Sequence, residues 1–384
     1  MIIEPAARTL SVQEYYFSKK NKEIARLNAG RGTPVINLGI GAPDGRPPQA
    51  AIDTLCESAQ KSGVHAYQSY VGIPELREAF AGWYARYYGV TLDPKTEIQP
   101  LVGSKEGILI LSLAFLDKGD KVLVPDPGYP TYTSATRLVE AEMVPYDLRE
   151  DNGWQPDFEA LEKMDLSGVK MMWTNYPNMP TGAPATRGLY EKLVDFGRRH
   201  GIMICNDNPY SFILNDEPLS ILSVPGARDC CVELNSLSKA HNMSGWRIGM
   251  IAGAQDVIAE FLKVKSQMDS GMFRPLQLAA VEALKQGPEW FTALNDEYRR
   301  RRVAAARIFD LLGAKYDSGS QGLFLWGKVG SGAAALSDKL LYEAGVFITP
   351  GFIFGHNGEE YIRISLCSKV EVLEKAYELI KNVL

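Results

Sequence analysis

Short apolar runs alternate with longer helical patterns through the middle of the chain, from about residue 97 to 253. The apolar runs are bounded by Gly, Pro, Asn or Asp, which predicts strands. Strands are expected at residues 98–102, 121–124, 143–146, 169–174, 202–206, 231–234 and 248–253, and helices between them, such as 105–116 and 130–139. This alternation predicts an α/β fold with a mostly parallel seven-stranded sheet that is sandwiched between helices.

The pattern changes after about residue 272. A helical stretch from 275 to 312 is broken near Gly287-Pro288, and two short strands (322–326 and 361–365) and a closing helix (369–383) follow. Since 384 residues exceed one ordinary hydrophobic core, two domains are expected. We place a large domain at residues 46–274 and a smaller α+β domain at 275–384.

Composition excludes several classes of protein. The chain has 46% hydrophobic and 23% charged residues, which is typical of a globular protein, and its net charge of −5 argues against nucleic acid as the main partner. No apolar run is long enough to span a bilayer, and the N-terminus lacks the pattern of a signal peptide. The five cysteines show no paired spacing, which indicates reduced thiols in a cytoplasmic protein, and the four histidines share no ligand spacing, so no metal site is expected.

The run Ser236-Leu237-Ser238-Lys239, with Arg247 a short loop further on, is the most informative motif. A lysine amine condenses with an aldehyde to a Schiff base. Serine hydroxyls and an arginine offer hydrogen bonds and positive charge to a phosphate. The motif therefore suits a covalently held, phosphorylated aldehyde.

Two further motifs follow expected strands. Asp207, with Tyr210 three residues later, ends the apolar run 202–206, where a carboxylate can pair with a cationic ligand or simply cap a turn. Gly103-Ser104-Lys105 precedes an apolar helix whose free N–H groups can bind an anion. An ordinary Ser N-cap is the alternative there, and both can hold together.

Near the C-terminus, Arg363 lies within an apolar strand. A charged side chain is costly there unless it is paired, so Arg363 binds either an anionic ligand or a structural carboxylate. Tyr129, in a turn after the strand at 121–124, either covers the core or stacks on a ligand.

Together these motifs resemble those of class I/II aminotransferases, the fold-type-I enzymes that depend on pyridoxal 5′-phosphate, from about residue 35 to 366. The resemblance implies a ping-pong transamination through a Schiff base on Lys239. It also implies that the N-terminal segment, residues 1–45, packs on the small domain. Because Tyr67 would reach the phosphate site of a neighbouring subunit, a homodimer is expected.

The resemblance assigns further roles by position. Asp207 pairs with the cofactor's ring nitrogen, Tyr210 donates to its phenolic oxygen, and Tyr129 stacks on its ring. The substrate's α-carboxylate is held by Arg363, with Gly39 close by. The phosphate is held by Gly103, Ser104, Lys105, Ser236, Ser238 and Arg247.

One position departs from the family pattern. Asn178-Met179-Pro180-Thr181-Gly182 has Met179 where the family has an asparagine that donates to the phenolic oxygen. A thioether cannot donate a hydrogen bond. Either Asn178 or Asn175 replaces this donor, or Tyr210 acts alone.

The substrate is less defined by the sequence. Residues 269–277 are similar to those of aspartate and LL-diaminopimelate aminotransferases, and Arg274 or Lys265 contacts a distal carboxylate or is merely a surface charge. We expect an acidic, aspartate-like amino donor with 2-oxoglutarate as acceptor. LL-diaminopimelate or another amino acid is the alternative, as is a carbon–sulfur β-lyase activity. A non-catalytic ligand sensor is not favoured, since no basic DNA-reading segment precedes residue 35. Residues 15–17 are interpreted as anchors on the small domain rather than as pocket residues.

Overall fold

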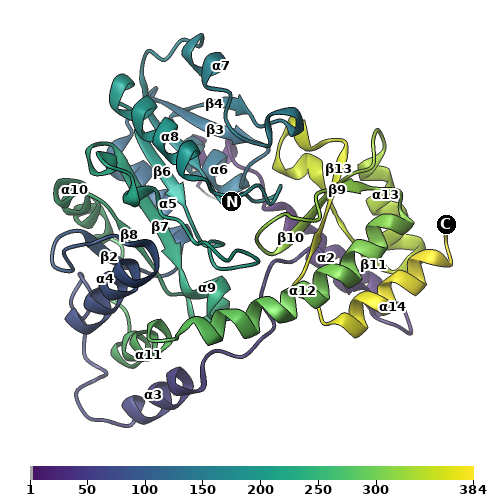
Figure 1. Ribbon diagram of the computed structural model, residues 1–384, viewed down its shortest axis with the longest axis horizontal. Coiled ribbons are helices and arrows are strands. Elements are labelled where there is room, and N and C mark those ends of the chain that lie inside the picture. The colour runs from purple at the N-terminus through teal and green to yellow at the C-terminus, as the bar shows by residue number, and fades with distance from the viewer. Residues whose placement is uncertain (1–2) are drawn as a thin grey trace.

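A seven-stranded sheet lies at the centre of the larger part of the molecule (Figure 1). The computed structural model describes residues 3–384. In chain order the strands are β2 (Ile98–Leu101), β3 (Lys121–Asp126), β4 (Glu142–Asp147), β5 (Val169–Thr174), β6 (Met203–Asp207), β7 (Cys231–Ser236) and β8 (Gly249–Ala252).

The strand order is β2-β8-β7-β6-β5-β3-β4. The pairings from β7 through β4 are all parallel, whereas β8 runs antiparallel to both β2 and β7. The prediction of a mostly parallel, seven-stranded sheet is confirmed. The reversed direction of β8 was not foreseen, because a buried strand has the same hydrophobic pattern in either direction.

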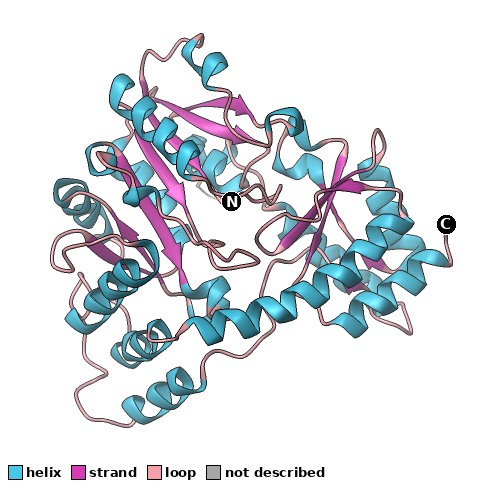
Figure 2. Ribbon diagram, viewed as in Figure 1, coloured by secondary structure: helices cyan, strands magenta, loops and turns pink. Residues whose placement is uncertain are grey.

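Both faces of the sheet are buried. In β5, Met171 and Trp173 belong to one core cluster and Met172 to another, because successive side chains of a strand point to opposite faces. The sheet therefore requires helices on both sides, and Figure 2 shows them there.

Helices α5 (Ser104–Phe115), α6 (Pro130–Leu138) and α10 (Gln255–Lys265) supply the core of one face. The core on the other face is built from α4 (Pro74–Tyr88), α8 (Arg187–His200) and α11 (Arg274–Leu284), with α3 (Gln49–Ala59) packed against α11. Two short helices, α7 (Phe158–Glu162) and α9 (Leu237–Ala240), complete this part of the fold. The expected helices at 105–116 and 130–139 are α5 and α6.

A long helix, α12 (Pro288–Leu311), leads from the large sheet into a smaller α+β domain (Figure 1). That domain has a second sheet of order β12-β13-β10-β9 and is closed by two helices. The predicted break near Gly287-Pro288 is confirmed, since α11 ends before it and α12 begins at Pro288. The remaining elements are β9 (Lys315–Tyr316), β10 (Phe324–Lys328), β12 (Thr349–Pro350), β13 (Tyr361–Ser365), α13 (Ala333–Lys339) and α14 (Val370–Lys381).

The N-terminal part of the chain contacts the small domain. Strand β1 (Ile36–Asn37) pairs with β11 (Val346–Phe347), and α2 (Tyr16–Ala29) contributes Ile24 to a small core cluster with Leu341 and Phe347. A short helix, α1 (Ala7–Leu10), precedes them. The exact domain boundaries after residues 45 and 274 stay a prediction.

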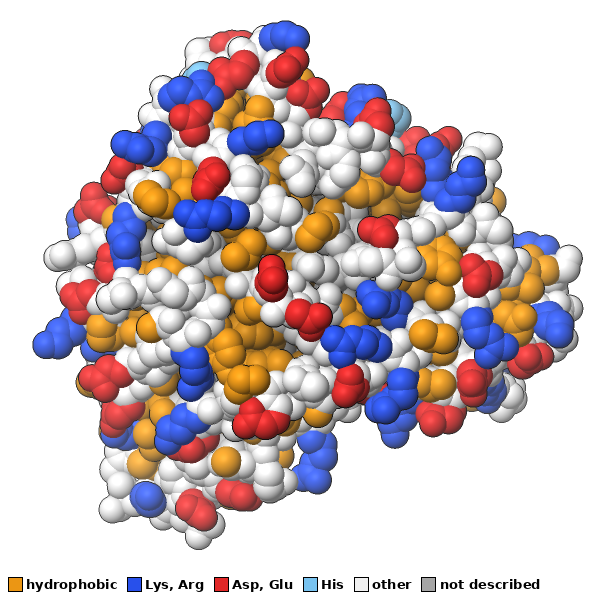
Figure 3. Space-filling view, in the orientation of Figure 1, with side chains coloured by type: hydrophobic (Ala, Val, Ile, Leu, Met, Phe, Trp, Pro, Cys, Tyr) orange, Lys and Arg blue, Asp and Glu red, His pale blue; other side chains and the backbone are white. Residues whose placement is uncertain are grey.

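Charges of both signs are mixed over the surface. On the face in Figure 3, Lys and Arg side chains are scattered among Asp and Glu side chains. This face therefore has no continuous basic patch of the kind that binds a nucleic acid. Within residues 3–384, no helix is long and apolar enough to cross a membrane, and no cluster of His, Cys, Asp or Glu is arranged to hold a metal ion.

Candidate active site

A cavity of about 380 Å³ lies where the carboxyl ends of the large sheet meet the small domain. In sheets of this kind, ligands bind at the carboxyl ends of the strands. The structure brings most of the sequence-predicted site residues to this one cavity: Gly39, Ser104, Lys105, Tyr129, Asp207, Tyr210, Ser236, Ser238, Lys239, Arg247 and Arg363.

Lys239 is the nucleophile that the cavity offers. It lies in α9, immediately after β7, and its Nζ donates to the main-chain oxygen of Gly41 and lies 5.9 Å from the ring centre of Tyr210. Burial lowers the pKa of Lys239, and the positive charges of Arg363 and Arg247 act in the same direction. A lowered pKa increases the fraction of free amine that can attack an aldehyde.

Asp207 ends β6 and directs a carboxylate into the cavity. Its Oδ2 accepts a hydrogen bond from the Tyr132 hydroxyl at 3.0 Å, whereas its buried Oδ1 has no partner among the described residues. Burial raises the pKa of Asp207 to about 7. A cationic N–H group of a ligand would both satisfy Oδ1 and stabilise the ionised carboxylate.

The start of α5 and the loop after α9 form an anion site. Gly103 caps α5 with a φ of 78°, and a Cβ there would lie 2.1 Å from Nη2 of Arg247, so glycine is needed for the guanidinium to approach. The sequence had suggested Ser104 as the N-cap, but Ser104 is the first helical residue. Its N–H group is therefore one of the free N–H groups at the positive end of a helix whose first residue lines the cavity.

Hydroxyl groups complete the anion site. Ser236 Oγ donates to Ser238 Oγ at 2.8 Å, and Arg247 Nη1 donates to the main-chain oxygen of Ser244 at 2.8 Å. No carboxylate in the described part of the chain pairs with Arg247, although it lines the cavity. Two hydroxyls and an unpaired guanidinium beside free helix N–H groups suit a phosphate.

Arg363 faces these groups from the small domain. It lies in the middle of β13 and is only 3% exposed. Its Nη2 donates to the Gly39 main-chain oxygen at 2.8 Å, and its Cζ lies 3.8 Å from the Phe324 ring centre and 4.5 Å from that of Phe354.

The alternative of a structural salt bridge does not apply to Arg363 within residues 3–384, because aromatic rings rather than a carboxylate surround it. Burial lowers the pKa of Arg363 to about 10, and its Nε has no partner among the described residues. A buried cation without a counter-ion is a site for an anionic ligand.

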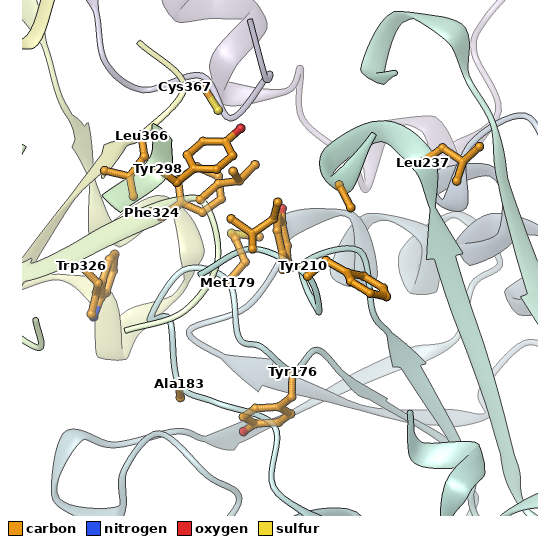
Figure 4. Packing of buried hydrophobic residues seen from close by; sticks show 14 of the residues in the cluster. Tyr176, Met179, Ala183, Tyr210, Leu237, Tyr298, Phe324, Trp326, Leu366 and Cys367 are labelled. Atoms are coloured by element: carbon orange, nitrogen blue, oxygen red, sulfur yellow. The ribbon is translucent and has the colours of Figure 1, made fainter. Parts of the chain in front are cut away.

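Met179 contacts this arginine. Its Sδ lies 3.2 Å from Arg363 Nη1, and Figure 4 shows Met179 close to Tyr210. The side-chain amide of Asn175 donates to the main-chain oxygen of Asp207, and that of Asn178 donates to the main-chain oxygen of Asn175 at 3.1 Å. Each amide keeps a second N–H, and Asn175 lines the cavity, so whether Asn175, Asn178 or Tyr210 alone donates stays a prediction.

Some predicted site residues lie outside this cavity. Tyr67 is 92% exposed, and Arg274 pairs with Glu75 at 3.1 Å on the surface. Lys265 is 2% exposed and pairs with Glu106 at 3.1 Å and Asp269 at 2.6 Å. Neither alternative given for Lys265 holds, since it is buried and paired and is thus neither a surface charge nor a wall of the cavity. Tyr67 and Arg274 stay predictions for a site formed with a second subunit.

The sequence missed several residues that line the cavity. Tyr15 and Phe17 lie in its wall, the role that the sequence analysis had not favoured, and Phe17 also packs against the small domain as expected. Tyr132, whose hydroxyl donates a hydrogen bond to Asp207, stacks on Trp173 with ring centres 4.9 Å apart. The only sequence signal for Tyr132 is its spacing of three residues from Tyr129, which places both side chains on the same side of one helical turn.

Comparison with known proteins agrees with this geometry. The family described as "Aminotransferase class I and II" matches residues 33–380. The chain belongs to this family. Aminotransferases of this family use pyridoxal 5′-phosphate, and the enzyme is a pyridoxal-phosphate-dependent aminotransferase of fold type I.

Individual relatives extend the comparison. The chain is 40% identical to an LL-diaminopimelate aminotransferase of Nitratidesulfovibrio vulgaris, over 98% of each chain. It superposes on the apo-BacF structure of Bacillus subtilis with a TM-score of 0.95 and 35% identity, covering 100% of this chain and 99% of that one. An aspartate aminotransferase mutant of Thermus thermophilus gives a TM-score of 0.92 at 28% identity, covering 100% of both chains.

The residues of the cavity fit the cofactor of an aminotransferase. The unpartnered Oδ1 of Asp207 suits a protonated ring nitrogen, and the glycine at position 103 leaves room for Arg247 beside a phosphate. Lys239 supplies the amine that an aldehyde requires.

Replacing Met179 with asparagine tests the missing hydrogen-bond donor. An asparagine amide would donate to the cofactor's phenolic oxygen and stabilise its anionic form. We expect the midpoint of a pH titration of the bound cofactor's absorbance to fall by about one pH unit. Met179→Leu, which adds no donor, should leave the midpoint in place. An unchanged midpoint in Met179→Asn would show that another group already donates.

Proposed function

We propose that this aminotransferase takes an amino group from LL-diaminopimelate and passes it to 2-oxoglutarate. The observation that carries the proposal is the identity of about 40% over nearly the full length to proteins named LL-diaminopimelate aminotransferase. These relatives favour LL-diaminopimelate, which the sequence analysis gave only as an alternative, over an aspartate-like donor.

The charges of the cavity support a substrate with two carboxylates. Besides Arg363, Lys105 lines the cavity and holds its ammonium 4.8 Å from the Tyr15 ring centre, without an ion pair to a carboxylate of residues 3–384. LL-Diaminopimelate carries a carboxylate at each end, so one end binds Arg363 and the other lies toward Lys105. The two cations therefore favour this donor over a monocarboxylic amino acid.

Within the proposal, pyridoxal phosphate when bound supplies the electron sink that weakens the Cα–H bond of an amino acid. Arg363 orients the substrate by a two-bond fork to its α-carboxylate. Lys239 Nζ would act as general base and then as general acid, taking the proton from the substrate's Cα and holding it on its amine for return.

Other side chains hold the cofactor and exclude water. Asp207 would keep the ring nitrogen protonated, Tyr210 would donate to the phenolic oxygen, and Tyr129 would cover the ring. The main-chain N–H groups of Gly103, Ser104 and Lys105 and the side chains of Ser236, Ser238 and Arg247 would hold the phosphate, which leaves the Lys105 ammonium for the substrate. The rings of Phe324 and Phe354, which line the cavity, keep the reacting atoms in an apolar surrounding.

The proposed enzyme is a homodimer. Tyr67 is 92% exposed in the single chain, and Tyr70 nearby is 47% exposed. Large aromatic side chains that are exposed together are typical of an interface. A second subunit would bury Tyr67 and bring its hydroxyl to the phosphate site of the partner.

A panel of amino donors tests the substrate. Purified enzyme with 2-oxoglutarate is offered LL-diaminopimelate, meso-diaminopimelate, aspartate and alanine, and glutamate formation is measured. We expect kcat/KM for LL-diaminopimelate to exceed that for aspartate by at least about tenfold, because relatives about 40% identical to this chain are named for that donor. A higher kcat/KM for aspartate would contradict the proposal. Release of pyruvate and ammonia from an L-cysteine conjugate, without glutamate formation, would indicate the β-lyase instead.

A further inference from the structure

The two domains are joined by hydrogen bonds where β3 ends. Asp126, the last residue of β3, accepts hydrogen bonds on Oδ2 from the His356 N–H at 3.0 Å and on Oδ1 from the Asn357 N–H at 2.9 Å. Both donors belong to a turn of the small domain, residues 354–358. One carboxylate of the large domain thus holds the backbone of this turn at two adjacent positions.

Three more hydrogen bonds hold the same turn. Asn357 Nδ2 donates to the Asp126 main-chain oxygen at 3.1 Å and to Asp147 Oδ1, at the end of β4, at 2.9 Å. The Gly128 N–H donates to the Phe354 main-chain oxygen at 2.8 Å. The turn is therefore fixed to the carboxyl ends of β3 and β4 rather than lying free on the surface.

Gly355 makes the approach of the carboxylate possible. Its φ is 142°, a conformation that residues with a side chain rarely adopt, and a Cβ there would lie 2.2 Å from Asp126 Oδ1. Any side chain at position 355 would push the carboxylate and the turn apart.

Both sides of this contact reach the active site. Tyr129 follows Asp126 closely in sequence and lines the cavity, and Phe354 begins the turn. The Phe354 ring centre lies 4.5 Å from Arg363 Cζ. Because Arg363 has aromatic neighbours in place of a carboxylate, a shift of Phe354 would remove one of the contacts that hold the guanidinium in its direction.

We propose that Asp126 is a positioning residue for substrate binding. By holding the 354–358 turn, its carboxylate keeps Phe354 against Arg363 and so keeps the guanidinium aligned for the substrate's carboxylate. The inference rests on the proposed role of Arg363 as the carboxylate site. Asp126 itself touches neither the cofactor site nor the substrate site, since it does not line that cavity.

Asp126→Asn provides the test, because its amide offers one acceptor and places an N–H₂ group against the second N–H of the turn. We expect KM for the best amino donor to rise about tenfold, with kcat within about twofold of wild type. The dissociation constant of glutarate, an unreactive dicarboxylate, should rise equally when measured by calorimetry on the holoenzyme. The absorbance spectrum of the bound cofactor should be unchanged.

Asp147→Asn is the matched control. It removes the same charge one strand away, but Asp147 pairs with Arg149 at 2.6 Å and contacts only the side chain of Asn357, so KM should change less than about twofold. Gly355→Ala should raise KM as Asp126→Asn does. The double variant of Asp126 and Gly355 should add little, because both changes break one contact.

Three outcomes would overturn the inference. The first is an unchanged KM and glutarate affinity in both Asp126→Asn and Gly355→Ala. The second is a rise of KM in Asp147→Asn equal to that in Asp126→Asn. The third is a loss of kcat and of cofactor absorbance in Asp126→Asn, together with an unchanged KM in Gly355→Ala. Arg363→Lys in the same assay separates the positioning role of Asp126 from the proposed role of Arg363 as the carboxylate site. If it leaves KM and the glutarate affinity unchanged, the role of Arg363 fails irrespective of Asp126.

Discussion

Replacing Lys239 with alanine is expected to lower kcat by about 10³-fold or more. Of the two lysines that line the cavity among the described residues, Lys105 lies in the first turn of α5 and is proposed to hold the substrate's distal carboxylate, which leaves Lys239 for the covalent attachment. The variant loses both the covalent attachment point of the cofactor and the group that moves the proton from Cα.

Single-turnover absorbance measurements with a large excess of amino donor would quantify this loss without interference from product release. Lys285→Ala is a suitable control, because this lysine is exposed and pairs with Glu282 at 2.6 Å, and its rate should equal that of wild type. A Lys239→Ala enzyme that keeps more than about a tenth of the wild-type rate would show that the proton is moved by another group.

Replacing Arg363 with leucine should raise KM for both the amino donor and the 2-oxo acid by about 10²-fold. The same guanidinium holds the α-carboxylate in each half-reaction, so both constants are expected to move together. Arg363→Lys should have an intermediate effect, because an ammonium keeps the charge but cannot form the two-bond fork.

Steady-state kinetics with each substrate varied in turn measure the two constants. A rise for only one substrate would mean that the other carboxylate binds elsewhere, and Lys105 would then be the first candidate. Thermal denaturation of the Arg363 variants in parallel would show whether the loss of a buried charge changes stability.

Much of this architecture could be predicted from sequence because it depends on local patterns. Apolar runs with glycine and proline boundaries gave the strands of the large sheet. Asp207 and Lys239 lie at the carboxyl ends of the parallel neighbours β6 and β7, and Ser104 follows β2, which points the same way as β7 because β8 runs antiparallel to both. That three separate motifs line one cavity is thus a consequence of the common direction of these three strands.

What depends on contacts distant in sequence could not be predicted. The arrangement of Phe324 and Phe354 around Arg363 arises from the packing of three segments, and no spacing within any of them indicates it. The hydrogen bonds between Asp126 and the 354–358 turn join residues 230 or more positions apart. Lys265 was misread for the same reason, because its partner Glu106 lies 159 positions away.

The choice of substrate depends partly on local sequence patterns and partly on contacts between distant residues. Lys105 is visible in the sequence as a cation, but only the fold shows that it lines the cavity without a carboxylate partner among the described residues. The relatives' names, rather than the motif at residues 269–277, favour LL-diaminopimelate over aspartate.

The proposed reaction depends on attachment of the cofactor to the side-chain amine of Lys239. Reducing freshly purified enzyme with borohydride, digesting it and mapping the modified peptide by mass spectrometry tests this directly. We expect a single pyridoxyl group, on Lys239. A pyridoxyl group on another lysine, or none on enzyme that contains bound cofactor, would contradict it.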